Sequence, residues 1–98
     1  MKYRIAAADS FNKWFKRLKD TAIKQRILAR FARIENGNFG DFKRVDTDLF
    51  ELRFFFGGGL RIYYTIRDER IVLLLKGGDK SNQDKDIQQA KQFLDELE

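Results

Sequence analysis

Basic side chains fall at regular positions on the strand-like segments in the second half of the 98-residue chain. Arg53, Arg61 and Lys76 share one face of three predicted strands, and Lys80 follows the last of them. Tyr63 lies on the same face, where cations can meet phosphates and a ring can stack on a base. These positions fit a nucleic-acid surface, but they equally fit an ordinary solvated sheet face.

The segment after the last predicted strand combines two glycines with a charged pair. Gly77 and Gly78 precede Asp79 and Lys80, just before the final predicted helix. A helix N-terminus presents free backbone amides to an anion, so this loop is either a phosphate site or a plain turn. A Walker motif needs glycine directly before the Lys-Ser pair and another glycine five residues further back. Asp79 and Leu74 occupy those positions, which argues against nucleotide hydrolysis.

The chain contains no cysteine and no histidine. Their absence excludes disulfides, thiolate metal sites, Ser-His and Cys-His catalysis, and the usual zinc sites. Any chemistry must use lysine, arginine, tyrosine, carboxylates or backbone amides, and we expect neither a metal nor a cofactor.

The net charge of +5 and the pI near 9.6 favour a polyanion, nucleic acid first, or an acidic protein as partner. The N-terminal sequence lacks the sustained apolar region of a signal peptide. The longest aliphatic run, residues 71–75, is far too short to span a bilayer. We therefore expect a soluble, cytoplasmic protein without a membrane partner.

Hydrophobic spacing, caps and turn residues predict the order strand, two helices, three hairpin-linked strands and helix. This order predicts one α+β domain over residues 1–98, with helices covering one face of a mainly antiparallel sheet. The expected elements are a strand over 3–7, a helix capped at Asp9 or Ser10 with its stripe at 11–18, a helix capped at Asp20 or Thr21 and ended by Asn36-Gly37, a loop over 38–48, strands over 49–56, 60–67 and 71–76, and a helix over 84–97.

Side chains alternate between the two faces of a strand, which assigns the apolar residues to the face beneath the helices. That face is expected to hold Phe50, Leu52, Phe54, Phe56, Leu60, Ile62, Tyr64, Ile66, Ile71, Leu73 and Leu75. The opposite face is expected to hold Glu51, Arg53, Arg61, Tyr63 and Lys76, together with Phe55, Val72 and Leu74.

Four segments together resemble a known family. "FNKWFKRLKD", "RILARFARIENGNFGD", "FELRFFFGGGLRIYY" and "LLLKGGDKSNQDKDIQQA" are similar to the phage-derived killer proteins of addiction modules, in the HigB-like branch of the RelE/ParE toxin superfamily. The resemblance implies a twisted, mainly antiparallel sheet with two N-terminal helices on one face, a basic cleft on the other, and a C-terminal helix.

The resemblance also implies a function. Members of the RelE and HigB branches are endoribonucleases that cleave mRNA, usually at the ribosome, by attack of the RNA 2′-hydroxyl without a metal. A cognate antitoxin, often a helix-turn-helix protein, blocks the toxin and binds operator DNA. The alternatives within the same fold are a ParE-like gyrase poison and an inactive relative that only binds an antitoxin or DNA.

Carried onto this chain, the resemblance gives roles to the basic residues. Arg61 in "GLRIYY" is expected to hold the scissile phosphate, Arg53 in "ELR" is a second basic position, and Lys80 is expected to stabilise the phosphorane. The residues expected to contact RNA are Lys76, Tyr63, Gly77, Gly78 and Gln83.

The general base and acid stay open. The base is Glu51, Asp79, Asp86 or a lysine with a depressed pKa, and Glu51 has the alternative of simply pairing with Arg53 or Arg61. The candidates for the acid are Lys76, Lys80 and Tyr63.

Overall fold

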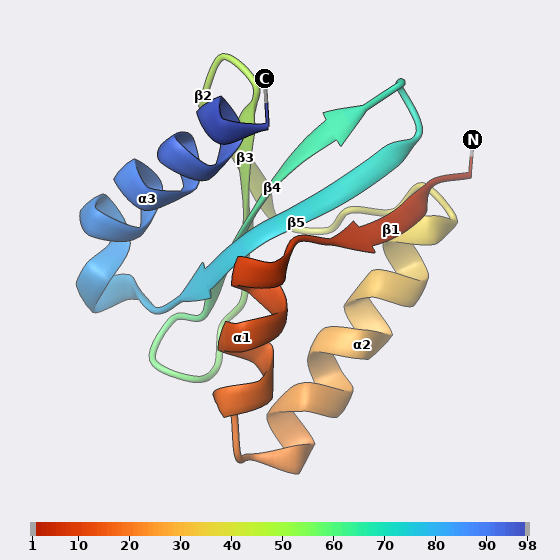
Figure 1. Cartoon of the computed structure of the whole chain (residues 1–98). Helices are drawn as coiled ribbons and strands as arrows, with labels where there is room; N and C mark the ends of the chain where they lie inside the picture. The colour runs from red at the N-terminus through yellow and green to blue at the C-terminus, as the bar shows by residue number, and fades with distance from the viewer. Residues whose placement is uncertain (1, 98) are drawn as a thin grey trace.

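The computed structural model describes residues 2–97 and has a five-stranded sheet with three α-helices (Figure 1). The sheet order is β1-β5-β4-β3-β2, with β1 parallel to β5 and every other pair antiparallel. The elements are β1 (Arg4–Ala7), α1 (Asp9–Arg17), α2 (Thr21–Glu35), β2 (Phe42–Asp46), β3 (Leu49–Arg53), β4 (Arg61–Arg67), β5 (Ile71–Gly78), the short 3-10 helix η1 (Lys80–Asn82) and α3 (Gln83–Glu96).

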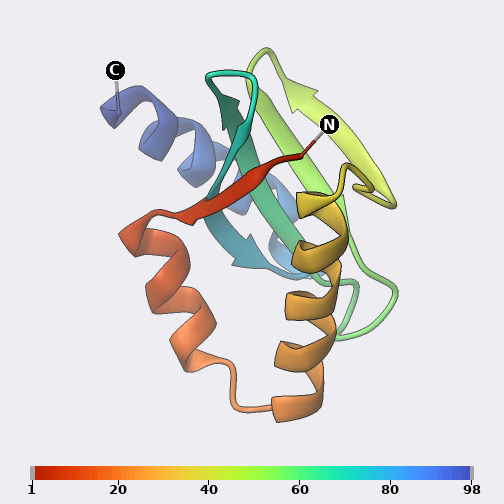
Figure 2. The same cartoon turned by 90° about the vertical axis from the view of Figure 1, so that its right-hand side faces the viewer.

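The helices cover both faces of the sheet, so the expectation that they share one face was wrong. The helices α1 and α2 pack against one face, and α3 packs against the other (Figure 2). The larger core lies under α1 and α2 and includes Ile27 and Ile62, whereas Tyr63 and Ala90 belong to the smaller core under α3. A helix on the second face is possible because that face also carries apolar residues, such as Leu75.

The strand β2 occupies a segment that was expected to be a loop. Its side chains are mostly exposed, so it lacks the apolar alternation by which a strand is recognised. It pairs with β3 as an edge strand, with a register shift between Arg44 and Asp46. Charged residues and bulges are common on edge strands because they discourage pairing with another chain.

A bulge in β5 corrects the predicted faces of that strand. Tyr63 pairs with Lys76 and Tyr64 pairs with Leu74, which leaves Leu75 as an extra residue. Before the bulge, Val72 and Leu74 join the core under α1 and α2, and Leu73 packs on the α3 side. Leu75 also lies in the core under α3. The faces predicted for these four residues were therefore wrong. After the bulge the phase changes by one residue. Lys76 therefore lies beside Tyr63 on the α3 side, as predicted.

The strands β3 and β4 are joined by a loop that is wider than the predicted tight hairpin. The strand β3 ends at Arg53 instead of continuing to Phe56, and β4 begins at Arg61. Gly57, Gly58 and Gly59 all have φ angles between +61° and +77°. This left-handed conformation is accessible to glycine at little cost, so the glycine triplet lets the loop curl back toward β5.

Candidate functional site

Glu51 is the centre of the polar cluster on the α3 side of the sheet. Its side chain is fully buried, and its Oε2 accepts a hydrogen bond from Gln83 Nε2 at 2.7 Å. Its Oε1 lies 3.7 Å from Arg61 Nε and 3.8 Å from Arg53 Nε. Three sequence-predicted residues from β3 and β4 thus meet Gln83 from the start of α3. The pairing of Glu51 with both arginines is the structural alternative that the sequence left open.

Three buried polar atoms in this cluster have no hydrogen-bond partner among the described residues: Glu51 Oε1, Arg61 Nε and Tyr63 OH. The Glu51–Arg61 distance is that of an ion pair and is too long for a hydrogen bond. Burial, followed by the negative charge of Glu51, raises the pKa of Tyr63. Tyr63 is therefore protonated at neutral pH and can donate a proton to a hydrogen bond. Unsatisfied buried groups are uncommon and often mark functional sites.

Arg61 and Lys80 approach each other across Gly59. Arg61 Nη1 donates to the carbonyl oxygens of Gly59 and Leu60 at 3.1 and 3.2 Å. A Cβ atom on Gly59 would lie 3.0 Å from Lys80 Cβ and 3.7 Å from Arg61 Nη1. The Lys80 amide also lies 3.4 Å from the Gly58 carbonyl oxygen. The glycine loop thus lies between the aliphatic part of the exposed Lys80 side chain and the mostly buried guanidinium of Arg61. Their roles at a phosphate stay a prediction.

Gly77 and Gly78 are required by close packing at the end of β5. A Cβ atom on Gly77 would collide with the ring of Trp14, and one on Gly78 would collide with the carboxylate of Asp86. The two glycines therefore let β5 pass between α1 on one face and α3 on the other. This packing explains the glycine pair without a ligand, and an RNA contact at either glycine stays a prediction.

Lys76 is paired with a carboxylate from α3. Its Nζ lies 3.6 Å from Asp86 Oδ1. Burial raises the pKa of Asp86, and the positive charge of Lys76 opposes this rise. Asp86 packs against Gly78, which is the register partner of Arg61, so the Lys76–Asp86 pair adjoins the arginine cluster.

Asp79 shapes the turn before α3. Its carboxylate accepts hydrogen bonds from the hydroxyl and the amide of Ser81, the latter at 2.9 Å. These bonds, the hydroxyl first, lower the pKa of Asp79. A carboxylate with a lowered pKa is a weak base at neutral pH. The geometry therefore favours the capping role over the general-base alternative.

The sequence did not single out Arg30, which fixes the end of β3. Arg30 projects from α2 and is buried, and its guanidinium donates to three carbonyl oxygens. These belong to Phe39 at 2.8 Å, Asp41 at 2.7 Å and Arg53 at 3.1 Å. A signal was present, because Arg30 lies next to Phe31 and three residues after Ile27 on the apolar side of α2.

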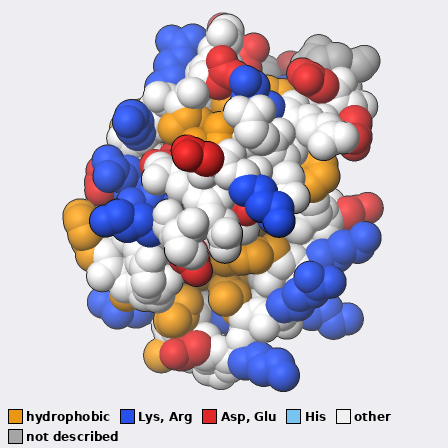
Figure 3. All heavy atoms as spheres, turned by 90° about the vertical axis from the view of Figure 1, so that its left-hand side faces the viewer, with side chains coloured by type: hydrophobic (Ala, Val, Ile, Leu, Met, Phe, Trp, Pro, Cys, Tyr) orange, Lys and Arg blue, Asp and Glu red, His pale blue; other side chains and the backbone are white. Residues whose placement is uncertain are grey.

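The surface on the α3 side carries charges of both signs. Basic side chains on this face are interspersed with acidic and apolar ones (Figure 3). The accessible cations of the candidate site are Arg53, with 41% of its side chain exposed, and the exposed Lys80.

Within residues 2–97, no helix is long and apolar enough to cross a membrane, and no three or more acidic side chains cluster as metal ligands would.

This architecture is the fold of the RelE toxins. A mutant of Escherichia coli RelE in the free state matches with a TM-score of 0.67, 14% identity, and coverage of 90% of this chain and 97% of that chain. RelE in the intact E. coli RelBE toxin–antitoxin complex matches with a TM-score of 0.60, 16% identity, and coverage of 79% and 95%. The fold that the sequence resemblance implied is confirmed.

The chain belongs to the Gp49-like family of phage-derived proteins, which it matches over residues 13–95. An uncharacterized protein of Haemophilus influenzae is 45% identical to it over 97 residues, which cover 99% of this chain and 98% of the relative. The expected membership of a phage-derived family is thereby confirmed, and the solved structures confirm the RelE-type fold.

Proposed function

We propose that this protein is the toxin of a type II toxin–antitoxin module and an endoribonuclease that cleaves mRNA at the ribosome. The RelE-type fold and the Gp49-like family support a toxin. The observation that carries the nuclease assignment is the meeting of Arg61 and Lys80 around Gly59, beside the partly exposed Arg53. Three cations at one end of the strands β3, β4 and β5 suit a scissile phosphate.

In the proposed reaction, the RNA 2′-oxygen loses its proton and attacks the adjacent phosphorus. The bond from phosphorus to the 5′-oxygen breaks, and that oxygen gains a proton. The products end in a 2′,3′-cyclic phosphate and a 5′-hydroxyl. Arg61 and Lys80 stabilise the extra negative charge of the phosphorane, as preorganised cations do in low-dielectric sites.

We assign Glu51 a positioning role, because it is fully buried and lies against both arginines. The proton carriers in this proposal are Asp86 and Lys76. Asp86 is the site carboxylate whose pKa burial raises, which makes it a stronger base than Asp79.

The second candidate is a ParE-like gyrase poison with the same fold. Internal charge pairing favours it, because Glu51 offsets Arg53 and Arg61 while Asp86 offsets Lys76. Internal pairing of charges weakens the attraction of a surface for phosphates, so this surface can equally contact a protein.

The proposed partners are a cognate antitoxin, mRNA and the ribosome, and operator DNA through the antitoxin. The antitoxin is supported by RelE, which is solved in complex with RelB. We expect a helix-turn-helix antitoxin.

Expression without an antitoxin tests the assignment. The proposal expects translation to stop, with new 5′ ends in mRNA and intact chromosomal DNA. Lys80→Ala should relieve toxicity, whereas Arg70→Ala, at the far end of the sheet, should not. Gyrase-linked DNA breaks with intact mRNA would establish the second candidate instead.

A further inference from the structure

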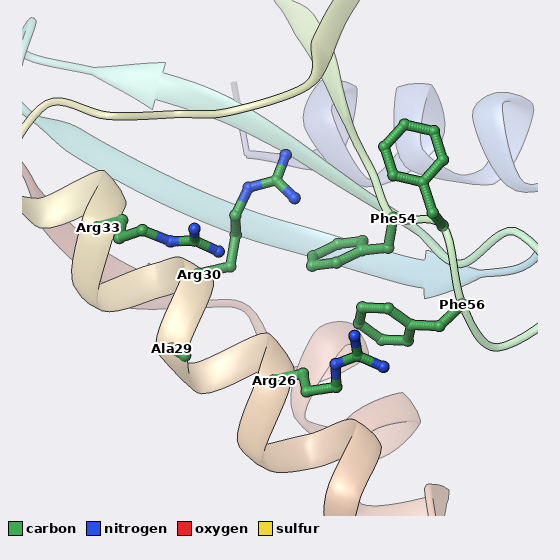
Figure 4. A pocket seen from close by; sticks show the side chains of 7 residues that line it. Arg26, Ala29, Arg30, Arg33, Phe54 and Phe56 are labelled. Atoms are coloured by element: carbon green, nitrogen blue, oxygen red, sulfur yellow. The ribbon is translucent and has the colours of Figure 1, made fainter.

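A groove between α2 and the β3–β4 loop is lined by arginines and phenylalanines (Figure 4). This Arg-Phe groove is formed by Arg26, Ala29, Arg30, Arg33 and Phe54 to Phe56, and it has a volume of about 470 Å³. It lies apart from the Glu51 cluster, because α2 covers the opposite face of the sheet from α3.

Two of the arginines make cation–π contacts with phenylalanine rings of the groove. The guanidinium carbon of Arg26 lies 4.3 Å from the ring centroid of Phe56, and that of Arg30 lies 4.7 Å from the ring centroid of Phe54. The Arg30 guanidinium is buried and donates to three carbonyl oxygens, so it closes the floor of the groove. The exposed Arg26 keeps its donors for a ligand.

Phe55 is the exposed ring of the groove. Its side chain is 92% exposed, whereas Phe54 is buried and Phe56 is partly buried. Proteins bind single-stranded nucleic acid through exposed aromatic rings, on which bases stack, and through nearby cations, which contact the phosphates.

The charge of the groove also selects its occupant. Its described walls carry three arginines and no carboxylate. Asp41, whose carbonyl oxygen accepts a hydrogen bond from Arg30, lies in the adjoining hollow. Arg26 and Arg33 are seven residues apart on one helix, which separates them by about 10 Å along its axis. A peptide helix would need a trench of open apolar wall. Here Arg26 and Arg30 already cover Phe56 and Phe54, so the groove suits RNA better.

The groove is connected to the candidate site by a hydrogen bond and by a shared chain segment. Arg30 Nη1 donates to the carbonyl oxygen of Arg53 at 3.1 Å, so the helix that forms the groove also holds the end of β3. Phe55 follows Arg53 by two residues in the same chain segment. A single strand of RNA bound at Arg53 and Lys80 can therefore continue over Phe55 toward α2.

We propose that the Arg-Phe groove binds the single-stranded RNA that flanks the cleaved phosphate. Phe55 stacks on one base, and Arg26 and Arg33 contact its neighbouring phosphates. This inference rests on the proposed endoribonuclease function and adds a second RNA contact region on the α2 side.

The test measures binding of the purified full chain to a short unstructured RNA whose 2′-O-methyl groups block cleavage, alongside cleavage of the same sequence with free 2′-hydroxyls. Phe55→Ala should weaken binding about tenfold, because stacking of one base is lost. Phe55→Trp should bind like the parent. Arg33→Ala should weaken binding and reduce the salt dependence by about one phosphate contact. Arg70→Ala is the matched arginine control, and it should change neither quantity.

The outcomes separate the two proposals. If the parent cleaves RNA and Phe55→Ala and Arg33→Ala bind like the parent, the groove proposal is wrong and the nuclease stands. If the parent neither binds nor cleaves RNA, in the presence of ribosomes as well, the proposed function fails and takes the groove proposal with it. If the two variants lose binding to a co-expressed antitoxin but keep RNA affinity, the groove is a protein interface and the proposal is overturned.

Discussion

Glu51 Oε1 lies 3.7 Å from Arg61 Nε, and both atoms are buried without a hydrogen bond to any residue in 2–97. Charge attraction holds the two groups together, and hydrogen bonds hold each of them in place. Glu51 Oε2 accepts from Gln83, and Arg61 Nη1 donates to the Gly59 and Leu60 carbonyls. The carboxylate thus fixes the guanidinium that we propose holds the scissile phosphate.

Glu51→Ala should destabilise the protein strongly, because two arginines would keep their charge without a compensating carboxylate. The loss expected for breaking a buried pair is about 3–5 kcal/mol in the free energy of unfolding, measured in urea. Asp46→Ala breaks the exposed ion pair with Lys91 and is the matched control, which should leave stability nearly unchanged. Equal effects of the two substitutions would contradict the central place of Glu51.

Gly78→Ala should destabilise the fold by about 1–3 kcal/mol, because the new methyl group collides with Asp86. Adding Asp86→Ala should recover part of that loss, since the obstructing carboxylate is removed. Additive losses in this double-mutant cycle would show that the two residues do not meet.

Gly77→Ala should lower the free energy of unfolding more than Gly78→Ala does. Its methyl group would overlap several carbon atoms of the Trp14 ring in α1, so the whole ring would have to shift. Asp86→Ala, on the other face of the sheet, should not restore its stability. Rescue by Asp86→Ala would mean that the packing at the end of β5 differs from that described above.

Asp86 should make the folded state less stable as pH rises. Its pKa is raised in the folded state above its ordinary value of 3.8, so the folded protein retains a proton that the unfolded chain has released. Stability should therefore fall as pH rises from about 4 through the folded pKa. Thermal unfolding over this range should show a smaller decline in Asp86→Asn.

Asp79 should act with the opposite sign. Its pKa is lowered by the Ser81 hydrogen bonds, so its contribution is present above the ordinary pKa and is lost as pH falls through the folded pKa. Asp79→Asn should therefore reduce the sensitivity to acid below about pH 4. A steeper acid transition in Asp79→Asn would contradict this assignment.

The turn between β4 and β5 should gain stability from glycine. Asp68 and Glu69 have φ angles of 53° and 62°, a conformation that is unfavourable for residues with a Cβ atom. Glu69→Gly should raise the free energy of unfolding by about 1 kcal/mol in urea, because glycine suits this position of the turn. Glu69→Ala is the control and should give no gain.

The sequence predicted both N-terminal helices because their apolar stripes are local signals. The cap predicted for α1 at Asp9 or Ser10 was wrong, because α1 begins at Asp9 after Ala8, which makes no side-chain cap hydrogen bond. The cap predicted for α2 was correct. Asp20, for example, accepts from the amides of Ala22 and Ile23, as the capping pattern indicated. It could not predict β2, whose exposed residues carry no apolar alternation, and which forms through its pairing with β3. The helix α3 was predicted, but its place on the second face depends on tertiary packing.

The candidate site was predicted in part. Alternation placed Glu51, Arg53 and Arg61 on one face because their strands are regular. The bulge at Leu75 has no local signature, so the face of Lys76 was correct while those of Val72 and Leu74 were wrong. Arg30 was missed because its role consists of contacts to distant backbone carbonyls.

The most direct test of the nuclease assignment is the chemistry of RNA ends produced by the purified protein on mRNA-programmed ribosomes. The proposal predicts 2′,3′-cyclic phosphate and 5′-hydroxyl ends, detected by mass spectrometry. It also predicts that Lys80→Ala, an exposed substitution that should not disturb folding, cleaves about 10²–10³-fold more slowly. RNA left intact by the parent protein, or equal cleavage rates for the parent and Lys80→Ala, would contradict it.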